Sequence, residues 1–496
     1  MRSFLALTAA CVAGIFAGAV GCTGDIGGSD EEPVPGPPKV EPKQVPAAPE
    51  LITSTATCSA LRPGEKLLSV SPEGHAWLVV EGSPNSVRVL DPFETSMVEV
   101  IEDVEIAGIV AGQAWSARDA AVVTDAGLWR LDDLARIELT PPSGFAAPGA
   151  LCGDPGQNGL LVSNGKVFER RLDGQWWSWN PGVEGEGAPN AIVRYDGDCQ
   201  STANLSWLTS ADGTLYRVEP ATFSRPVRFE GFVGAAATND SVAVLETDML
   251  WMGPDAWQSW IFPGPVPTEL SASAGLYWMV SGSQLLRFDG ETFNEVTHGI
   301  TGPIERVAAH AGGAWVVGGD KICHQATGPM VRIEGVRPFS RTTEIEIPIR
   351  VRASDASDVT ATIDGTPITL VSDDEGWLAG EARLDTVGWH TIDLAAAGGG
   401  AARSVVVKRL PEVTRSWEAD IAPIYQASCT NSDCHRAGSS DPPDLGSYDA
   451  WKEHSVAIRT RVLEAKTMPP AANIGPEWGD DDIETIREWL EGGMLP

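Results

Sequence analysis

The strongest constraint on the fold is a repeat of about 40 residues between positions 51 and 324. In each copy a small turn residue precedes an apolar or aromatic anchor, and an arginine often follows. The anchors lie 42, 39, 48, 35, 35 and 37 positions apart: Val87, Trp129, Phe168, Tyr216, Trp251, Leu286 and Cys323. Short β-branched and aromatic runs between Gly, Asp and Asn are typical of strands. A four-stranded propeller blade needs about 40 residues, so we predict a β-propeller of about seven blades over residues 51–328. Six blades or a pair of β-sandwiches are the alternatives.

The first 22 residues have the features of an export signal. Arg2 supplies the positive charge, and the apolar stretch over residues 4–20 is too short for a transmembrane span. The stretch ends in Ala-Val-Gly-Cys22, which resembles a bacterial lipobox. This resemblance implies that Cys22 is lipidated and becomes the mature N-terminus, and Thr23 after it favours the outer membrane. An ordinary secretory signal with an incidental cysteine is the alternative.

Residues 23–50 contain the run EEPVPGPPKVEPKQVPAAPE. A Pro- and charge-rich stretch of this kind cannot bury a core, so we expect an extended tether. No later stretch of the sequence is long and apolar enough to span a bilayer. The sequence therefore predicts that the chain is exported and attached to the bacterial cell envelope through lipid at its N-terminus, on the periplasmic face or the cell surface.

Four cysteines of the repeat region are expected to pair, because exported cysteines usually form disulfides. Cys58 lies in the first strand of the predicted ring and Cys323 in one of the last. A propeller closes by adding its N-terminal strand to the final blade, so these two would be neighbours. Cys152 and Cys199 fall at similar points of adjacent repeats. We therefore predict the disulfides Cys58–Cys323 and Cys152–Cys199.

Between residues 329 and 411 the pattern changes to longer alternating strands, such as EIEIPIRV and RSVVVKRL. Six or seven strands in about eighty residues suit an immunoglobulin-like β-sandwich. The Cys-Trp-Cys core of antibody domains is missing. His390, which lies beside Trp389 in one of these strands, is expected to be packed and not functional.

Residues 412–496 have a helical pattern that surrounds the motif Cys429-Thr-Asn-Ser-Asp-Cys434-His435. A first helix precedes the motif, a second runs through Trp451 to about residue 464, and a third begins at residues 480–482. The acidic residues at the start of this third helix favour its dipole. The segment Met468-Pro-Pro lies between the second and third helices.

This order resembles the single-haem cytochrome c domains of exported bacterial proteins. The resemblance implies a small all-α domain with one covalent haem c. Cys429 and Cys434 would form thioethers, His435 would be the proximal iron ligand and Met468 the distal one. The usual motif is Cys-x2-Cys-His, whereas four residues separate the cysteines here. A local Cys429–Cys434 disulfide is the alternative, and a zinc site lacks a fourth ligand. His454 and Met494 are the other candidates for the distal position.

The formal net charge is −33 at pH 7. This charge excludes DNA, RNA and anionic lipid headgroups as partners, because polyanions would be repelled. It provides solubility outside the cell, or it suits a cationic redox protein.

The sequence therefore predicts an electron-transfer protein and not an enzyme. One haem with two protein ligands leaves no open site for a substrate, so it would pass electrons to a redox partner. The propeller would be a binding or docking platform whose ligand the sequence does not identify. The alternatives are a cell-surface binding or adhesion protein whose haem is minor or lost, and a propeller dehydrogenase that passes electrons to the haem. The second alternative resembles quinohaemoprotein dehydrogenases in architecture only.

Overall fold

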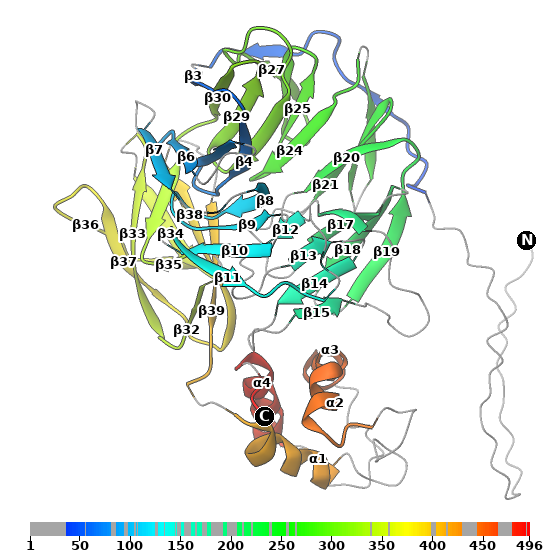
Figure 1. The fold of residues 1–496 in the computed structure, drawn as a ribbon, viewed down its shortest axis with the longest axis vertical. Coiled ribbons are helices and arrows are strands. Elements are labelled where there is room, and N and C mark those ends of the chain that lie inside the picture. The colour runs from blue at the N-terminus through cyan, green and yellow to red at the C-terminus, as the bar shows by residue number, and fades with distance from the viewer. Residues whose placement is uncertain are drawn as a thin grey trace, which may run out of the picture. The chain divides into compact units, whose positions relative to one another are not determined.

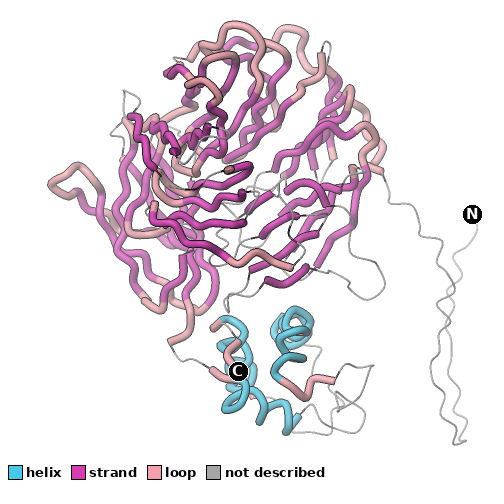
Figure 2. Tube along the Cα trace, viewed as in Figure 1, coloured by secondary structure: helices cyan, strands magenta, loops and turns pink. Residues whose placement is uncertain are grey.

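The structure is a computed structural model of the chain. It describes residues 36–496 except 55, 81–85, 94–97, 104–105, 107, 125–126, 133, 144, 146–149, 153–159, 164–165, 171–175, 180–191, 196–205, 211–212, 220–221, 238–240, 254–256, 263–264, 338–339, 356–357, 398–402, 413–414, 429–443, 465–478 and 493. These residues belong to one compact unit, Pro35–Pro496. Strands dominate it, and the described helices lie in its C-terminal part (Figure 2). None of these helices is long and apolar enough to cross a membrane.

Four antiparallel sheets of four strands each follow one another along the first half of the described chain (Figure 1). The first is β4 (Glu65–Val70), β5 (Ala76–Val80), β6 (Ser86–Asp91) and β7 (Val98–Asp103). The second is β8 (Ile109–Ala114), β9 (Ala120–Thr124), β10 (Gly127–Asp132) and β11 (Ala135–Leu139). The third is β12 (Ala150–Cys152), β13 (Leu160–Ser163), β14 (Lys166–Arg170) and β15 (Trp176–Trp179). The fourth is β16 (Ile192–Tyr195), β17 (Ser206–Ser210), β18 (Thr214–Glu219) and β19 (Thr222–Arg228).

Three further sheets continue the series, and each also takes a strand from the N-terminal segment. The fifth is β20 (Phe232–Ala237), β21 (Val242–Glu246), β22 (Met249–Gly253) and β23 (Gln258–Ile261), with β1 (Lys43–Gln44) at its edge. The sixth is β24 (Glu269–Ser273), β25 (Leu276–Ser281), β26 (Gln284–Phe288) and β27 (Phe293–Val296), with β2 (Glu50–Ile52) at its edge. The seventh is β28 (Arg306–His310), β29 (Gly313–Gly318), β30 (Lys321–Ala326) and β3 (Thr57–Ala60).

These seven sheets are the blades of a β-propeller. The first strands of neighbouring sheets contact one another, β4 with β8, β8 with β12, β12 with β16, β20 with β24, β24 with β28, and β28 with β4. The second strands, such as β5, β9, β25 and β29, are apolar and mostly buried because blades pack against both of their faces. The seven repeat anchors all lie in the third strand of their blade, so the predicted register is confirmed.

The ring closes where the N-terminal strand β3 completes blade 7. Cys58 of β3 lies directly opposite Cys323 of β30 in the strand register. The two residues form a disulfide that joins positions 265 residues apart. This pairing is the one that the sequence predicts from propeller closure. Cys199, and the side chain of Cys152 at the end of β12, lie outside the described residues, so the Cys152–Cys199 pairing stays a prediction.

The predicted tether is wrong at its C-terminal end. Within the predicted tether, residues 43–44 form β1, which pairs in parallel with the outer strand β23. Residues 50–52 form β2 at the predicted boundary of the propeller and pair in parallel with the outer strand β27. Val45 is buried in the core shared by blades 5 and 6, and the amine of Lys43 lies over the Trp260 ring at 5.1 Å. The end of the Pro-rich segment is therefore part of the propeller. Its backbone N–H and C=O groups pair with those of an outer blade strand, which would otherwise have an unpaired edge.

A buried ion pair ties blade 1 to β3. Arg88 of β6 donates from Nε to Glu65 Oε1 at 2.8 Å and forms a second bond from Nη2 to Glu65 Oε2. Arg88 also donates to the Ala60 carbonyl at 2.9 Å and to Ser59 Oγ at 3.2 Å. The Arg88 and Glu65 side chains are only 4% and 2% exposed. Each charge therefore depends on its partner for the hydrogen bonds that water would otherwise provide.

Arg88→Met should lower the free energy of unfolding by about 3 to 5 kcal/mol, because it leaves the Glu65 carboxylate buried without its partner. The double variant Arg88→Met/Glu65→Leu should recover much of this loss. Arg383→Met is the matched control, since its pair with Glu346 is exposed and should cost less than about 1 kcal/mol. Denaturant unfolding followed by tryptophan fluorescence measures all three. A loss for Arg88→Met as small as that of the control would contradict the prediction.

Residues 331–409 form two sheets around one apolar core. One sheet has the order β31 (Val331–Glu334), β33 (Glu346–Ala353), β37 (Leu378–Arg383) and β36 (Val371–Ser372). The other has the order β32 (Ser340–Thr342), β39 (Arg403–Arg409), β38 (Gly388–Ala396), β34 (Val359–Ile363) and β35 (Thr366–Ile368). Apolar side chains of both sheets make up the core, among them Val351, Ile392 and Val405. This is a β-sandwich; its assignment as immunoglobulin-like stays a prediction.

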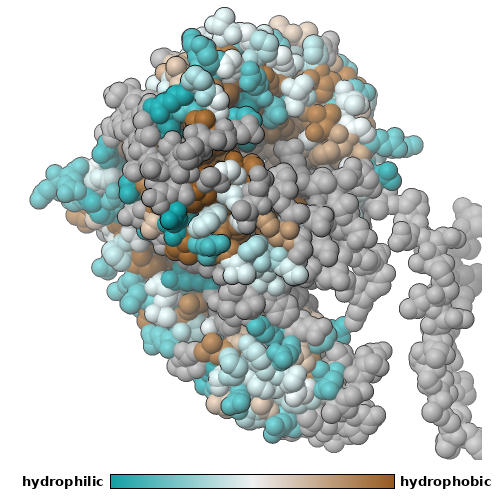
Figure 3. Space-filling model, viewed as in Figure 1, coloured by the Kyte–Doolittle hydropathy of each residue, from teal (hydrophilic) through white to brown (hydrophobic). Residues whose placement is uncertain are grey.

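Several polar contacts lie within the sandwich. The hairpin of β36 and β37 is hydrophilic at its tip (Figure 3), where Arg350 pairs with Asp373 and Glu375 at 2.7 and 2.6 Å. His390 is buried, with Nδ1 at 2.6 Å from Asp364 Oδ2 and Nε2 at 2.7 Å from the Thr386 carbonyl. It is therefore packed within the sandwich, as the sequence indicates.

The C-terminal part is helical. Its elements are a π-helix η1 (Trp417–Ile421), α1 (Ala422–Ser428), α2 (Tyr448–Glu453), α3 (Ser455–Ile458), a π-helix η2 (Arg459–Glu464) and α4 (Asp480–Glu491). Ser416 caps η1 by accepting from the Ala419 N–H, and Ser447 caps α2 by accepting from the Ala450 N–H. Asp482 accepts from the Gly479 N–H at 3.1 Å at the start of α4. The three helical regions predicted from the sequence are present in these places.

Candidate functional site

The predicted haem residues lie outside the described residues. Cys429, Cys434 and His435 belong to the gap 429–443, and Met468 belongs to the gap 465–478. The elements on both sides are described: α1 ends at Ser428, α2 begins at residue 448, η2 ends at residue 464 and α4 begins at residue 480. The helices that flank both gaps are the described part of the candidate site. The lipidation candidate Cys22 also lies outside the described residues.

Aromatic side chains join these helices into one core. Trp417 of η1, Trp451 of α2 and Trp489 of α4 are buried, and their ring centroids lie 5.5 to 6.4 Å apart. Tyr425 of α1 packs against Trp417 and Trp451 at 6.2 and 6.4 Å. Large buried aromatic rings contribute much of the stability of so small a core. The segments with the predicted haem residues connect helices of this core: residues 429–443 lie between α1 and α2, and residues 465–478 lie between η2 and α4.

The end of the chain is bonded to the same core. Trp489 Nε1 and the Trp417 backbone N–H both donate to the Leu495 carbonyl at 2.9 Å. The Tyr448 hydroxyl donates to the Met494 carbonyl at 2.9 Å, and the Met494 side chain is buried in the aromatic cluster. His454, the other alternative ligand, is the partly buried C-cap residue of α2.

One buried donor of this core lacks a partner. Trp451 is 1% exposed, and its Nε1 has no hydrogen-bond partner among the described residues. A buried donor without an acceptor costs about 1 to 3 kcal/mol. The donor set of two Cys, one His and one Met has the chemistry that covalent haem attachment and axial ligation require. These residue types suit a covalent haem, and haem binding stays a prediction.

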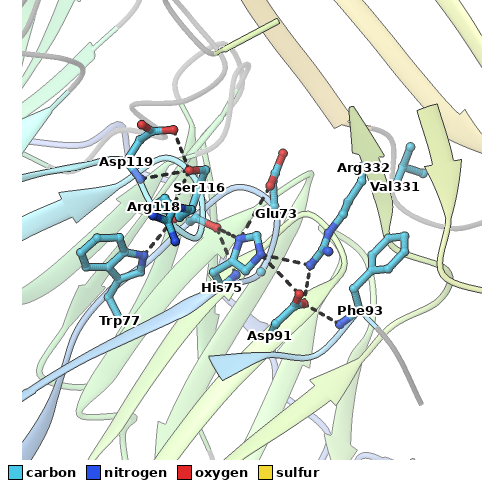
Figure 4. Close-up of polar contacts among 12 residues, drawn as sticks. Glu73, His75, Trp77, Asp91, Phe93, Ser116, Arg118, Asp119, Val331 and Arg332 are labelled. Atoms are coloured by element: carbon cyan, nitrogen blue, oxygen red, sulfur yellow. Dashed lines mark hydrogen bonds and ion pairs between the residues drawn. The ribbon is translucent and has the colours of Figure 1, made fainter. Parts of the chain in front are cut away.

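A second polar cluster, which the sequence did not predict, lies where the sandwich meets blade 1 (Figure 4). His75, in the turn between β4 and β5, accepts at Nε2 from Arg332 Nη2 of β31 at 3.1 Å. Arg332 also bonds to Asp91 at the end of β6, and its guanidinium lies over the Phe93 ring at 4.2 Å. Since a guanidinium only donates, the proton of neutral His75 lies on Nδ1, which is 3.0 Å from Ser71 Oγ.

Further contacts fasten the sandwich to the propeller at this cluster. Arg403 of β39 pairs with Glu73 at 3.1 Å, and Arg337 pairs with Asp119 at 3.5 Å. Burial lowers the pKa of Arg403, although the charge of Glu73 opposes that effect. Burial alone would raise the pKa of Asp91, but its interactions with His75, with the Arg332 guanidinium and with the Phe93 backbone N–H hold that pKa well below its usual range. Charged groups at this junction are thus paired across it.

This junction does not have the features of a metal or catalytic site. Among the described residues, no group of three His, Cys, Asp or Glu side chains is arranged to hold a metal ion. His75 lies between Ser71 and Asp91, as the histidine of a hydrolase triad lies between its serine and its aspartate. Ser71 is fully buried, however, and cannot reach a substrate. The one sequence signal for the cluster is the similarity of Gly-His-Ala-Trp77 and Gly-Gly-Ala-Trp315, which start the second strands of blades 1 and 7.

No family model matches this chain, and no curated protein matches it. Solved propeller structures are similar to it at low identity. The structure described as YCF48 bound to D1 peptide is 12% identical, with a TM-score of 0.40, over 57% of this chain and 100% of that one. The extracellular domain of BT4673 from B. thetaiotaomicron is 10% identical, with a TM-score of 0.39, over 70% of this chain and 56% of that one. Hsv2 from Kluyveromyces marxianus is 10% identical, with a TM-score of 0.36, over 66% of this chain and 100% of that one. At these TM-scores none of them tells us what the chain binds or does.

Proposed function

We propose that the chain is an exported, lipid-anchored c-type cytochrome that acts in electron transfer. The observation that carries this proposal is the motif Cys429-x4-Cys434-His435, followed by Met468-Pro-Pro, in the segments between helices that share one aromatic core. Cys429 and Cys434 would hold the haem through thioethers. His435 and Met468 would be the two axial ligands of the iron.

The residues of the chain suit the transfer of electrons and not the catalysis of a reaction. A bound haem supplies a one-electron iron couple whose potential is raised by a His and Met ligand pair relative to two histidines. Pro469 and Pro470 restrict the backbone that presents the Met468 sulfur. Two protein ligands would leave no coordination position for a substrate, so the site would exchange electrons with a partner protein.

The net charge of −33 supports a cationic redox partner, since opposite charge speeds the encounter of two proteins. The propeller would be the docking platform for that partner or for another ligand. Lipidation of Cys22 would hold the chain at the cell envelope, with the outer membrane favoured by Thr23. In this arrangement the free tether ends earlier than the sequence indicates, because β1 and β2 lie on the propeller.

The test is to express the full chain with a bacterial haem-attachment system and to measure its absorption spectrum before and after denaturation. We expect a red protein with a low-spin spectrum whose haem stays bound after denaturation, because thioethers survive unfolding. Cys429→Ala/Cys434→Ala should lose covalent haem, whereas the control Cys152→Ala/Cys199→Ala should keep it. A colourless wild-type protein with a Cys429–Cys434 disulfide would overturn the proposal and favour the binding-protein alternative.

A further inference from the structure

Two buried histidines of blade 7 are joined by one hydrogen bond. His310, at the end of β28, and His324, in β30, have stacked rings, and their Nε2 atoms are 2.9 Å apart. His310 Nδ1 accepts from the Gly312 backbone N–H at 3.2 Å, so the proton of His310 lies on Nε2. His310 then donates to His324 Nε2, and the proton of His324 lies on Nδ1. This arrangement requires both rings to be neutral.

A second proton cannot enter this pair without breaking it. Protonation of His324 at Nε2 would place two N–H groups against each other, and protonation of His310 at Nδ1 would remove the acceptor of Gly312. Both side chains are at least 96% buried, and among the described residues no carboxylate is within hydrogen-bond distance of either ring. Asp91 favours a charge on His324, but burial outweighs that effect, so an extra charge on the pair is disfavoured.

His75 and Asp91 of blade 1 are the charged or titratable neighbours of the pair. Arg332 of the sandwich bonds to both of them, and Glu73 beside them pairs with Arg403. Burial, together with the nearby charges of His324 and His75, lowers the pKa of His310 well below its usual value. Burial lowers the pKa of His324 to about 4, although Asp91 acts in the opposite direction.

The pair is in contact with the turn that carries the junction. Gly74 has a positive φ of 90°, and a Cβ added to it would lie 2.8 Å from Cε1 of His310, so the ring rests directly on this glycine. Trp315 Nε1 donates to the Gly74 carbonyl at 2.7 Å, and the Trp315 ring packs against His324 at 5.1 Å. The next residue, His75, accepts from Arg332 of the sandwich. Movement of His310 would therefore disturb the turn and its bond to β31.

We propose that His310 and His324 form an acid-sensitive latch, in which protonation of either ring releases the turn at residues 71–75 and loosens the sandwich from the propeller. The latch is independent of the proposed haem function, because it involves none of the haem residues. It would make the junction between the two β domains respond to the acidity of the surroundings.

The direction of the pH effect follows from linkage. A histidine whose pKa is lower in the closed state binds more protons after opening, so the closed state loses stability as the pH falls below 6.5. For a single histidine that changes from about 4 closed to 6.5 open, the opening constant should rise about 20-fold between pH 7 and pH 5. Asp91 does not reverse this trend, because its lowered pKa keeps it ionised in that range.

Hydrogen exchange of the full chain at pH 7 and pH 5, corrected for the intrinsic exchange rate, tests the latch. Peptides over residues 71–77 and 328–334 should lose protection about 20-fold at pH 5. Peptides of β21 and β34 should change much less. The variant His310→Gln/His324→Gln keeps a donor facing an acceptor without a titratable group, and its junction should show no such loss. His298→Gln is the control and should behave as the wild type, because the His298 ring bonds to Ser283 and Ile300 and not to this pair.

Three outcomes would overturn the latch. One is equal loss of protection in all peptides at pH 5, which would be general acid unfolding. Another is unchanged protection of the junction in the wild type. The third is a His310→Gln/His324→Gln variant that still opens with acid, which would assign the effect to His75. If that double variant does not fold, His324→Gln alone replaces it, and its junction should open less than 20-fold between the two pH values.

Discussion

Met468→Ala is expected to leave the haem covalently attached but to change its spectrum, whereas His435→Ala should abolish stable haem incorporation. The physical reason is that Cys429 and Cys434 hold the haem independently of Met468. Loss of the thioether sulfur opens the sixth coordination position, so carbon monoxide should bind and the reduction potential should fall. Loss of the proximal histidine removes the ligand that positions the iron during attachment. Absorption spectra, carbon monoxide binding and a potentiometric titration measure these effects.

Two control variants make this test specific. His454→Gln and Met494→Leu should leave the spectrum unchanged, because we assign neither residue to the iron. Met494→Leu keeps the volume of a side chain that is buried in the aromatic cluster, so the domain should still fold. An unchanged spectrum in Met468→Ala would show that another residue is the distal ligand, and His454 would be the first to replace in turn.

Removal of the ring-closing disulfide should lower the free energy of unfolding of the propeller by about 5 to 6 kcal/mol. The bond closes a loop of 265 residues between Cys58 and Cys323, and in the chain-entropy description a long loop restricts the unfolded chain most strongly. Cys58→Ala/Cys323→Ala keeps the apolar character of the site, where a Cβ on Gly299 would approach Cys58 Sγ at 2.8 Å. Denaturant unfolding under non-reducing conditions measures the loss.

The single variants are the internal control for this prediction. Either Cys58→Ala or Cys323→Ala removes the whole cross-link, so each should cost nearly as much as the double variant, and the costs should not add. A double variant that loses less than about 1 kcal/mol would mean that β3 and its pairing with β30 close the ring without the bond.

The local pattern of the sequence determines the propeller. A third strand with an apolar anchor such as Trp129 or Leu286 repeats in every blade, because each blade must bury the same surfaces against its neighbours. The repeat also predicts that Cys58 lies beside Cys323, because the last blade of a propeller is completed by the first strand of the chain. The buried aromatic faces of the C-terminal helices likewise follow from helical spacing, as Ile486, Trp489 and Leu490 show.

Only the tertiary structure shows that residues 43–44 and 50–52 pair with outer blade strands, and which groups surround the buried histidines. β1 and β2 join outer strands through backbone hydrogen bonds, which any sequence can form, so a Pro-rich composition does not reveal them. His75 and His310 lie 310 − 75 = 235 positions apart and come together only because blade 7 closes against blade 1. Burial and the neighbouring His324 and His75 lower the pKa of His310, and Arg332 of the sandwich bonds to His75. Strand periodicity thus comes from local residue order, whereas pairing and charge environment depend on which distant surfaces the closed ring brings into contact.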